Sequence, residues 1–539
     1  MLPEPDLYDV VILGGGINGC GTFRDLALQG LRVLLIEKGD FCQGASAASS
    51  RLMHGGLKYL ETGEFRLVRE SAEERNRLLA NAPHYVTPLP CIVPVRSRFG
   101  GIVPSVLRFL RIKSRLTDRG SLITALGLTL YDIYGRNFRA MPKHRMLRRK
   151  ALDRTISGLD AGIIAAGLYY EGQLSHAERL GFELVIDGEA LHPASQALNH
   201  AEITATADGV VSYLHRGQTH RVRPRIIINA AGAWIDRVNA QLGLATHLMG
   251  GSKGAHLVVE NAGLHAALNG HMVYFGTADG RVNLVYPFMG RVLIGSTDIK
   301  IDDPDLAHCD EDEADYLRGC IAEIFPAITV SPDQICHRFS GVRPLPRSGG
   351  DIGLVTRDHS IAELALTGGT PVLCLIGGKW TTFRGFSEQV ARKVATTLGR
   401  TRHVETTTMA IGGGKDFPKA AQRKAWVAAR ARTTGLREPR IEALLSRYGT
   451  LAETMAQILS AGDTPLATLP DYSREELLML VTRERVATLA DLVLRRTSIA
   501  MSGHLTPQVA GEIGAIVAAA LHWDAARLQS EIAALPIRS

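Results

Sequence analysis

The stretch that decides the fold is VVILGGGINGCG, residues 10–21. The apolar, β-branched run from Tyr8 to Leu13 predicts a buried strand. Gly14, Gly16 and Gly19 follow with the spacing GxGxxG, and a helical pattern comes next. A strand, a glycine turn and a helix in this order are typical of a dinucleotide-binding unit. The amides and the dipole at the start of the helix bind a pyrophosphate there.

A second strand predicted over Leu31 to Ile36 ends at an acidic residue, Glu37, 18 residues after Gly19. Dinucleotide folds place an acid at this point to bind the ribose hydroxyls. The alternative, a glycine turn without a ligand, would not require the acid. We therefore predict a dinucleotide site that includes Gly14, Gly16, Asn18, Gly19 and Glu37.

Two further segments favour a long, planar cofactor. Residues 44–51, GASAASSR, are small and rich in hydroxyls, and His54-Gly55-Gly56 follows them. Residues 377–382, GGKWTT, put a second glycine turn after the apolar run VLCLI. An NAD enzyme needs one such turn, whereas FAD lies between several, so we expect FAD; unrelated loops are the alternative. The added cofactor candidates are Ser46, Ser49, Ser50, His54, Gly55, Gly56, Gly378, Lys379 and Thr381.

Strand-like runs between Glu202 and Pro287 predict an antiparallel substrate sheet beside the dinucleotide-binding fold. They include RIIINA, residues 225–230, and the hairpin pattern of LVYP followed by RVLIGSTD. The sequence IGGGKDFP near Ile411 indicates a linker, after which the patterns are helical. We predict an oxidoreductase region over residues 1–410, with discontinuous FAD-binding and substrate parts, and a helical domain over 415–539.

Composition excludes several classes of protein. The seven cysteines among 539 residues are scattered without CxxC spacing, so neither a disulfide framework nor a metal site is expected. The sequence contains no run of about 18 apolar residues, so no membrane-spanning helix is predicted. The N-terminal residues lack the basic start of a signal peptide. These features favour a cytoplasmic protein.

Positive charge is concentrated between Arg96 and Lys150, where fourteen Lys and Arg face two Asp. Because apolar residues alternate with the basic ones, this stretch suits the surface of an anionic membrane, on the inner face of the cell membrane. A solvated basic face near an anionic substrate is an equal alternative. No aromatic platform accompanies the charge, so nucleic-acid binding is not expected.

Several segments resemble one family in sequence and in order. They are VVILGGGINGCG, ASSRLMHGGLKYLETGEFRLVRES, APH, NAAGAW, KGAHLVV, IGSTD, SGVRPL, TRDHS and GGKWTTFR. Together they are similar to the FAD-dependent glycerol-3-phosphate dehydrogenases, although NAAGAW also occurs in amine and sarcosine oxidases. The resemblance implies an α/β fold with a Rossmann-like, D-amino-acid-oxidase-like FAD domain of the two-dinucleotide-fold type. An antiparallel substrate sheet and a helical C-terminal domain complete this expected architecture.

The resemblance also implies a reaction and the residues for it. The family oxidises sn-glycerol 3-phosphate to dihydroxyacetone phosphate and passes electrons through the flavin to membrane quinone; a homodimer is compatible with this reading. It implies that His256 lies near the reacting hydroxyl. Catalytic or substrate cations would be Arg343, Arg357 and Lys379, with Lys58 and Tyr59 in the substrate site and Gly232 in the cofactor site.

The sequence departs from the family at points that leave the substrate open. Lys58 replaces the usual arginine and lacks its bidentate fork. Ser175, His176 and Glu178 stand in a segment that is usually rich in aspartate. Dehydrogenation of another polyol phosphate, such as a tetritol phosphate, is therefore an alternative. A flavin oxidase of an amine or hydroxy acid, and a flavin-binding protein without catalysis, are the others.

Overall fold

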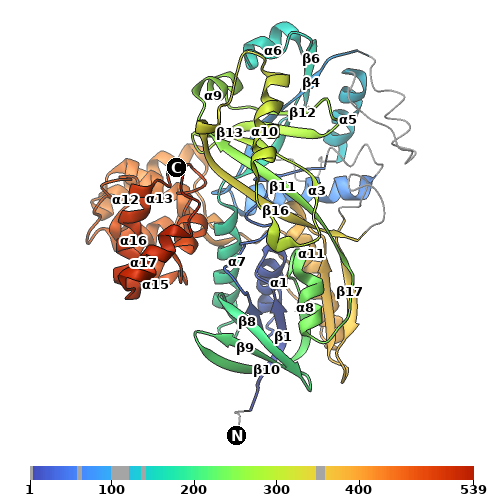
Figure 1. Cartoon of the computed structure of the whole chain (residues 1–539), viewed down its shortest axis with the longest axis vertical. Helices are drawn as coiled ribbons and strands as arrows, with labels where there is room; N and C mark the ends of the chain where they lie inside the picture. The colour runs from blue at the N-terminus through green and yellow to red at the C-terminus, as the bar shows by residue number, and fades with distance from the viewer. Residues whose placement is uncertain (1–3, 57–63, 99–120, 135–140, 348–357, 539) are drawn as a thin grey trace.

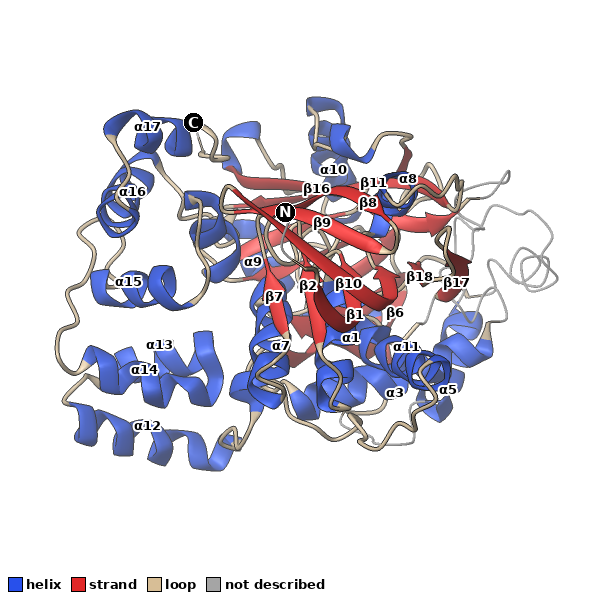
Figure 2. Cartoon of the chain, turned by 90° about the horizontal axis from the view of Figure 1, so that it is seen from below, coloured by secondary structure: helices blue, strands red, loops and turns tan. Residues whose placement is uncertain are grey.

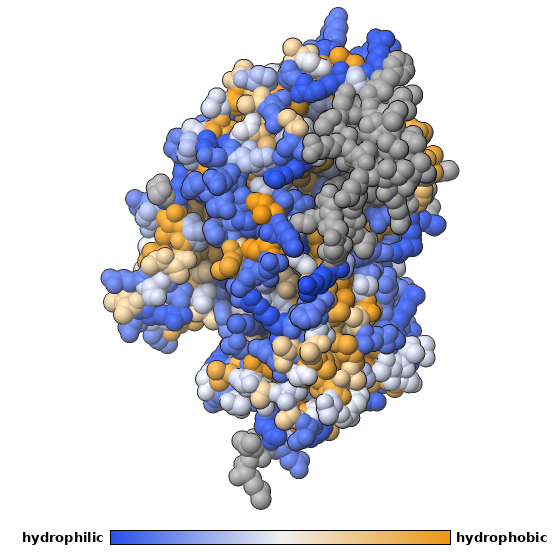
Figure 3. All heavy atoms as spheres, turned by 45° about the vertical axis from the view of Figure 1, so that its right-hand side comes forward, coloured by the Kyte–Doolittle hydropathy of each residue, from blue (hydrophilic) through white to orange (hydrophobic). Residues whose placement is uncertain are grey.

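The computed structural model describes residues 4–56, 64–98, 121–134, 141–347 and 358–538. Two large sheets lie one above the other in Figure 1, and a group of helices flanks them on one side. Figure 2 shows from below that these C-terminal helices stand apart from the strands. The face in Figure 3 is mainly hydrophilic, with apolar groups near its middle and in its lower half.

The lower sheet is the dinucleotide-binding sheet, with eight strands in the order β17-β18-β10-β1-β2-β7 and with β8 and β9 attached at β10. From β18 to β7 its neighbours are parallel. Helices α1, α7 and α11 pack on one face through Phe23, Phe182 and Phe386. The bounds are β1 Asp6–Leu13, α1 Ile17–Leu28, β2 Val33–Ile36, α7 Ala177–Leu191, β7 Gln196–Leu198, β8 Ala201–Ala207, β9 Val210–His215, β10 Gln218–Asn229, β17 Ser360–Ala365, β18 Pro371–Ile376 and α11 Phe383–Thr397.

The prediction that the strand-like runs from Glu202 to Pro287 form one antiparallel substrate sheet was wrong for β8, β9 and β10. These strands belong to the dinucleotide-binding sheet, where β10 runs parallel to β1 with Val10 opposite Ile226. The apolar run of β10 is buried on both sides, which is typical of an inner parallel strand.

The upper, ten-stranded sheet is mainly antiparallel and contains the predicted hairpin of β13 and β14. Helices α9 and α10 cover one of its faces through Leu264, Leu317 and Ile321. The bounds are β3 Leu52–Met53, α3 Phe65–Asn81, β4 Val86–Val95, α5 Ser121–Tyr134, β5 Arg145–Arg148, α6 Arg149–Thr155, β6 Ala165–Leu174, α8 Ile235–Gln241, β11 Met249–Val259, α9 Ala262–Leu268, β12 Met272–Gly276, β13 Val282–Phe288, β14 Arg291–Gly295, β15 Ile299–Lys300, α10 Glu311–Ile324 and β16 Ile335–Pro346.

The C-terminal part is helical, as predicted from the sequence. It has a core of its own that includes Leu444, Leu480 and Ile513. The sequence EELLMLVTRERVATLADLVLRR, residues 475–496, predicts one helix, but the structure breaks it, because α15 ends at Arg483 and Arg485 takes a left-handed φ of 54°. A short π-helix, Asp491–Arg496, follows. A boundary near 411–415 remains our proposal. The helices are α12 Ala420–Thr434, α13 Glu438–Tyr448, α14 Ala452–Leu459, α15 Arg474–Arg483, α16 Pro507–Leu521 and α17 Ala525–Ala533.

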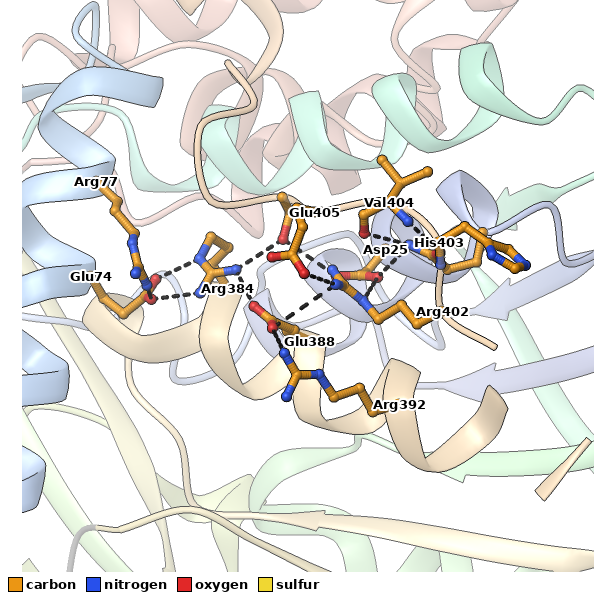
Figure 4. A network of polar contacts seen from close by, with 12 residues as sticks. Asp25, Glu74, Arg77, Arg384, Glu388, Arg392, Arg402, His403, Val404 and Glu405 are labelled. Atoms are coloured by element: carbon orange, nitrogen blue, oxygen red, sulfur yellow. Dashed lines mark hydrogen bonds and ion pairs between the residues drawn. The ribbon is translucent and has the colours of Figure 1, made fainter. Parts of the chain in front are cut away.

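A buried ion network ties α11 to α3 and to α1 (Figure 4). Arg384 donates to Glu74 at 2.6 and 2.8 Å and to Glu388 at 2.7 Å. Arg402 pairs with Asp25 of α1 at 3.0 Å. Because α1 begins at the glycine turn and α11 follows the second turn, this network fixes the two helices that position both turns.

Replacing Arg384 by Gln should lower the free energy of unfolding by about 3 kcal/mol, because two buried carboxylates each lose one of their cations. The midpoint of urea denaturation measures this change. Arg392 also pairs with Glu388, but its side chain is 63% exposed, so Arg392→Gln is the matched control. It should cost less than about 1 kcal/mol. Similar losses in the two variants would contradict a stabilising role specific to Arg384.

Candidate functional site

A cavity of about 1500 Å³ lies between the two sheets. Pockets for drug-sized ligands measure about 300–1000 Å³, so this one has room for a cofactor and a substrate together. The turns after β1 and β18 line it, as do the segment 44–50 and residues on several strands of the upper sheet. The predicted residues on its wall are Gly14, Gly16, Asn18, Glu37, Ser46, Ser49, Ser50, His54, Gly56, Gly232, His256, Arg343, Gly378, Lys379 and Thr381.

The first glycine turn leaves no room for side chains. Gly14 has a left-handed φ of +108°, and a Cβ there would lie 2.8 Å from the carbonyl carbon of Ala230. A Cβ on Gly19 would lie 2.0 Å from the carbonyl oxygen of Gly14. Gly19 thus allows α1 to cross directly over the turn, with its first amides beside the cavity. This geometry fits a pyrophosphate.

The second turn is joined to the first. The side-chain amide of Asn18 donates to the carbonyl oxygen of Gly377 at 3.1 Å. A Cβ on Gly378 would lie 2.5 Å from the same amide nitrogen. Ser46 Oγ accepts the amide hydrogen of Ile17 at 3.0 Å. Segments far apart in sequence therefore meet at the start of α1, as a long cofactor lying across several turns requires.

Glu37 lies at the end of β2, where the sequence placed it. Its carboxylate accepts the amide hydrogens of Gly15 at 2.5 Å and Gly39 at 2.8 Å. Burial raises the pKa of Glu37 above its ordinary value, while these amide donors lower it. The acid is therefore held beside the pyrophosphate turn, where a ribose would lie.

The C-terminal domain supports the turn that follows Glu37. Asp40 is fully buried and accepts from Arg495 at 2.6 Å and from Arg496 at 2.7 and 2.8 Å. Asp491 bonds His200 at 2.9 Å and Arg495 at 2.6 Å. The π-helix Asp491–Arg496 thus reaches across the domain contact and fixes this turn through Asp40.

His256 lies in a row of residues that crosses the upper sheet: Tyr274, Leu284, Gly295, His256 and Phe339. Its ring stacks on Phe339, with centroids 4.9 Å apart, and its Nε2 lies 2.8 Å from Ser50 Oγ. Burial, with Arg343 and Arg51 nearby, lowers the pKa of His256 to about 3. The imidazole is therefore neutral at ordinary pH.

The guanidinium of Arg343 lies against β11 and the loop after β14. It donates to Asp298 Oδ1 and Ser296 Oγ, both at 3.1 Å, and to the carbonyl oxygen of Thr297 at 3.0 Å. Gly254 provides the space, because a Cβ there would lie 2.3 Å from the guanidinium. Arg343 is thus a positioned cation on the cavity wall.

Some predicted residues lie elsewhere. Gly19 and Gly55 are not among the residues that line the cavity. Lys58, Tyr59 and Arg357 fall outside the described residues, as does much of the basic stretch 96–150.

The departures from the family at residues 175–178 do not line the cavity. Glu178 forms a buried ion pair with Arg51 at 2.6 Å, and His176 Nδ1 lies 2.9 Å from Ser175 Oγ. Burial, with cations nearby, lowers the pKa of His176 to about 3. Glu178 thus supports the segment 44–51 through Arg51, and none of these residues is among those that line the cavity.

The sequence did not single out three acidic or aromatic residues on the cavity wall: Glu171, Trp234 and Asp298. Trp234 Nε1 donates to Asp305 at 2.7 Å, which joins the two halves of the molecule at the cavity. Glu171 lies two residues after Tyr169 on β6, so the two side chains face the same side of the sheet. That alternation in YYEGQL was the signal for Glu171.

Comparisons with known proteins agree with this geometry. The sequence pattern of the FAD dependent oxidoreductase family matches residues 9–384, and that of the C-terminal domain of alpha-glycerophosphate oxidase matches residues 404–528. The chain therefore belongs to the FAD-dependent oxidoreductases, and within them to the FAD-dependent glycerol-3-phosphate dehydrogenase family.

Individual relatives cover nearly the whole chain. A glycerol-3-phosphate dehydrogenase of Synechocystis sp. is 33% identical over 92% of this chain and 89% of its own length. A D-erythritol 1-phosphate dehydrogenase of Brucella abortus is 32% identical over 92% of this chain and 95% of its own length. The FAD complex of glycerol-3-phosphate dehydrogenase from Bacillus halodurans has the same fold, with a TM-score of 0.75 at 22% identity over 98% of this chain and 93% of its own.

Replacing Gly19 by Ala should weaken FAD binding by about 10- to 100-fold, because α1 must move away from the turn to admit the methyl group. The flavin absorbance of the purified protein, followed during titration of the apoprotein with FAD, measures the effect. Gly319 on α10 has open space around it, so Gly319→Ala should leave FAD binding unchanged. Normal affinity in Gly19→Ala would contradict the assignment of this turn.

Proposed function

We propose that this protein oxidises the C2 hydroxyl of sn-glycerol 3-phosphate to give dihydroxyacetone phosphate, and that the electrons pass to quinone. The observation that carries the proposal is a cavity that joins the FAD-binding turns to a wall bearing Arg343, Lys379 and His256. The glycerol-3-phosphate dehydrogenases of Synechocystis sp. and Bacillus halodurans support it.

The residues of the chain supply binding and proton transfer. FAD, when bound, supplies the hydride acceptor. Arg343 and Lys379 would attract the phosphate and favour negative charge on the oxygen that becomes the carbonyl. His256 would accept the hydroxyl proton while Ser50 holds its ring. Its lowered pKa of about 3 keeps the imidazole neutral, so the ring is free of the proton that it has to accept.

A second candidate is dehydrogenation of a tetritol phosphate. The Brucella relative, named for D-erythritol 1-phosphate, is nearly as similar to this chain as the glycerol phosphate enzyme. The lysine at position 58, where the family usually has arginine, also favours a substrate that differs from glycerol 3-phosphate. A flavin oxidase of an amine or hydroxy acid is a third candidate. The positive charges of Arg343 and Lys379 support it less than they support a phosphorylated substrate.

We further propose that the chain docks on the inner face of an anionic membrane, where quinone is available. The support is α5, whose Leu126 and Ile133 are 61% and 50% exposed, within the basic stretch 96–150. No helix in the described ranges has the length and apolar character needed to cross a bilayer. Binding to vesicles that contain anionic lipid, and its loss in Leu126→Asp, tests this docking.

Anaerobic mixing with glycerol 3-phosphate, erythritol phosphate, an amine and a 2-hydroxy acid tests the substrate. Loss of flavin absorbance should be fastest with a polyol phosphate. Reoxidation by quinone without hydrogen peroxide separates a dehydrogenase from an oxidase. Bleaching by the amine alone would reject the proposal.

Arg343→Gln should slow flavin reduction by glycerol 3-phosphate at least about 30-fold, because a preoriented cation is lost, while FAD content stays normal. Stopped-flow absorbance measures the rate. Arg338 lies five residues earlier on β16 and pairs with Glu311 outside the cavity, so Arg338→Gln is the control. Loss of FAD together with the rate would indicate that Arg343 is structural.

The pH profile should carry no inflection from His256 between pH 5 and 8. Its pKa is lowered from 6.5 to about 3, so the ring is neutral throughout that range. His256→Gln should therefore reduce kcat without moving the apparent pKa values of kcat/KM. Steady-state rates across pH test this, and disappearance of an inflection near 6.5 in the variant would contradict it.

A further inference from the structure

Glu171 brings a carboxylate to the cavity with only one of its oxygens bonded. The residue lies on β6 and is 1% exposed. Its Oε2 accepts the amide hydrogen of Gly55 at 2.8 Å and a guanidinium hydrogen of Arg75 at 3.2 Å. Its Oε1 has no hydrogen bond to any residue in the described part of the chain. His54 Nδ1, 4.0 Å away, is too far for one.

Such an oxygen calls for a donor from a ligand. A buried acceptor without a partner costs free energy, and native structures rarely leave one unbonded. Arg75, itself only 4% exposed, balances the charge of the carboxylate, so the group remains in place without help from solvent. Glu171 is one of the residues that line the cavity, so a bound molecule lies beside its carboxylate.

The negative charge of the carboxylate decides which part of the ligand Oε1 can bind. A carboxylate repels a phosphate and accepts a hydrogen bond from a hydroxyl. The cations of the cavity come from other elements, Arg343 from β16 and Lys379 from the turn after β18. A molecule with phosphate at one end and a hydroxyl at the other can therefore satisfy both groups.

We propose that Glu171 Oε1 binds the hydroxyl at the end of the polyol chain opposite the phosphate, and so makes the enzyme select a hydroxylated chain end. The inference rests on the proposed polyol phosphate dehydrogenase activity and adds a specificity residue to it. The hydroxyl that is oxidised is a different one, assigned above to His256.

Binding of two phosphate esters without a hydroxyl at the reacting carbon tests the contact. 3-Hydroxypropyl phosphate keeps the terminal hydroxyl and propyl phosphate lacks it. Isothermal titration of the holoenzyme should give about 10- to 100-fold tighter binding of the hydroxylated ester, because its bond is to a charged acceptor. In Glu171→Gln the amide oxygen stays with Arg75 and Gly55, and the preference should fall below about fivefold.

Turnover provides the second measurement. With 2-hydroxypropyl phosphate, which keeps the reacting hydroxyl and lacks the terminal one, Glu171→Gln should reduce kcat/KM less than threefold. With glycerol 3-phosphate the same variant should reduce it about tenfold. Equal losses on the two substrates, or an unchanged preference between the two esters, would overturn the assignment and indicate that Glu171 only positions the segment 54–56.

Controls separate this inference from the proposed function. If the wild-type flavin is not reduced by any polyol phosphate, the proposed function fails; if it is reduced and Glu171→Gln discriminates as the wild type does, only the inference fails. Glu363→Gln, on an exposed carboxylate of β17, should change none of these values. If Glu171→Gln does not retain FAD, Glu171→Asp is measured in its place, with the same expected loss of preference.

Discussion

Helix α1 crosses the first glycine turn with Gly19 against the carbonyl oxygen of Gly14, at a distance that no side chain permits. This contact sets the position of the first helical amides relative to β1. The second turn depends on it, since Asn18 of the same helix holds the carbonyl of Gly377. The acid of β2 depends on it too, because Glu37 accepts the amide of Gly15. A single backbone approach thus places three parts of the cofactor site.

The features predicted correctly from sequence were those encoded locally. The glycine spacing, the strand before it and the acid at Glu37 lie within thirty residues, and each has its own residue pattern. The hairpin of β13 and β14 and the helical C-terminal part were likewise visible in periodicity. The resemblance to a family supplied the distant site residues, of which His256, Arg343 and Lys379 meet at one cavity.

What failed depended on partners far away in sequence. The sheet to which β10 belongs is decided by its pairing with β1, more than 200 residues earlier, and its own residues cannot show that. The helix break at Arg485 is a second case, because that side chain bonds Glu189 of α7 at 2.6 and 2.8 Å. Glu171 is a third: its spacing from Tyr169 indicates which face of the strand it occupies, but not that Arg75 and Gly55 bury it there.

The buried ion pairs between Asp40 and the arginines of the π-helix have a consequence for biosynthesis. Arg495 and Arg496 come 455 and 456 residues after Asp40 in the chain, yet they support the turn beside Glu37. Domains generally fold in the order in which they emerge. The turn beside Glu37 therefore gains these buried cations only after the π-helix has been synthesised.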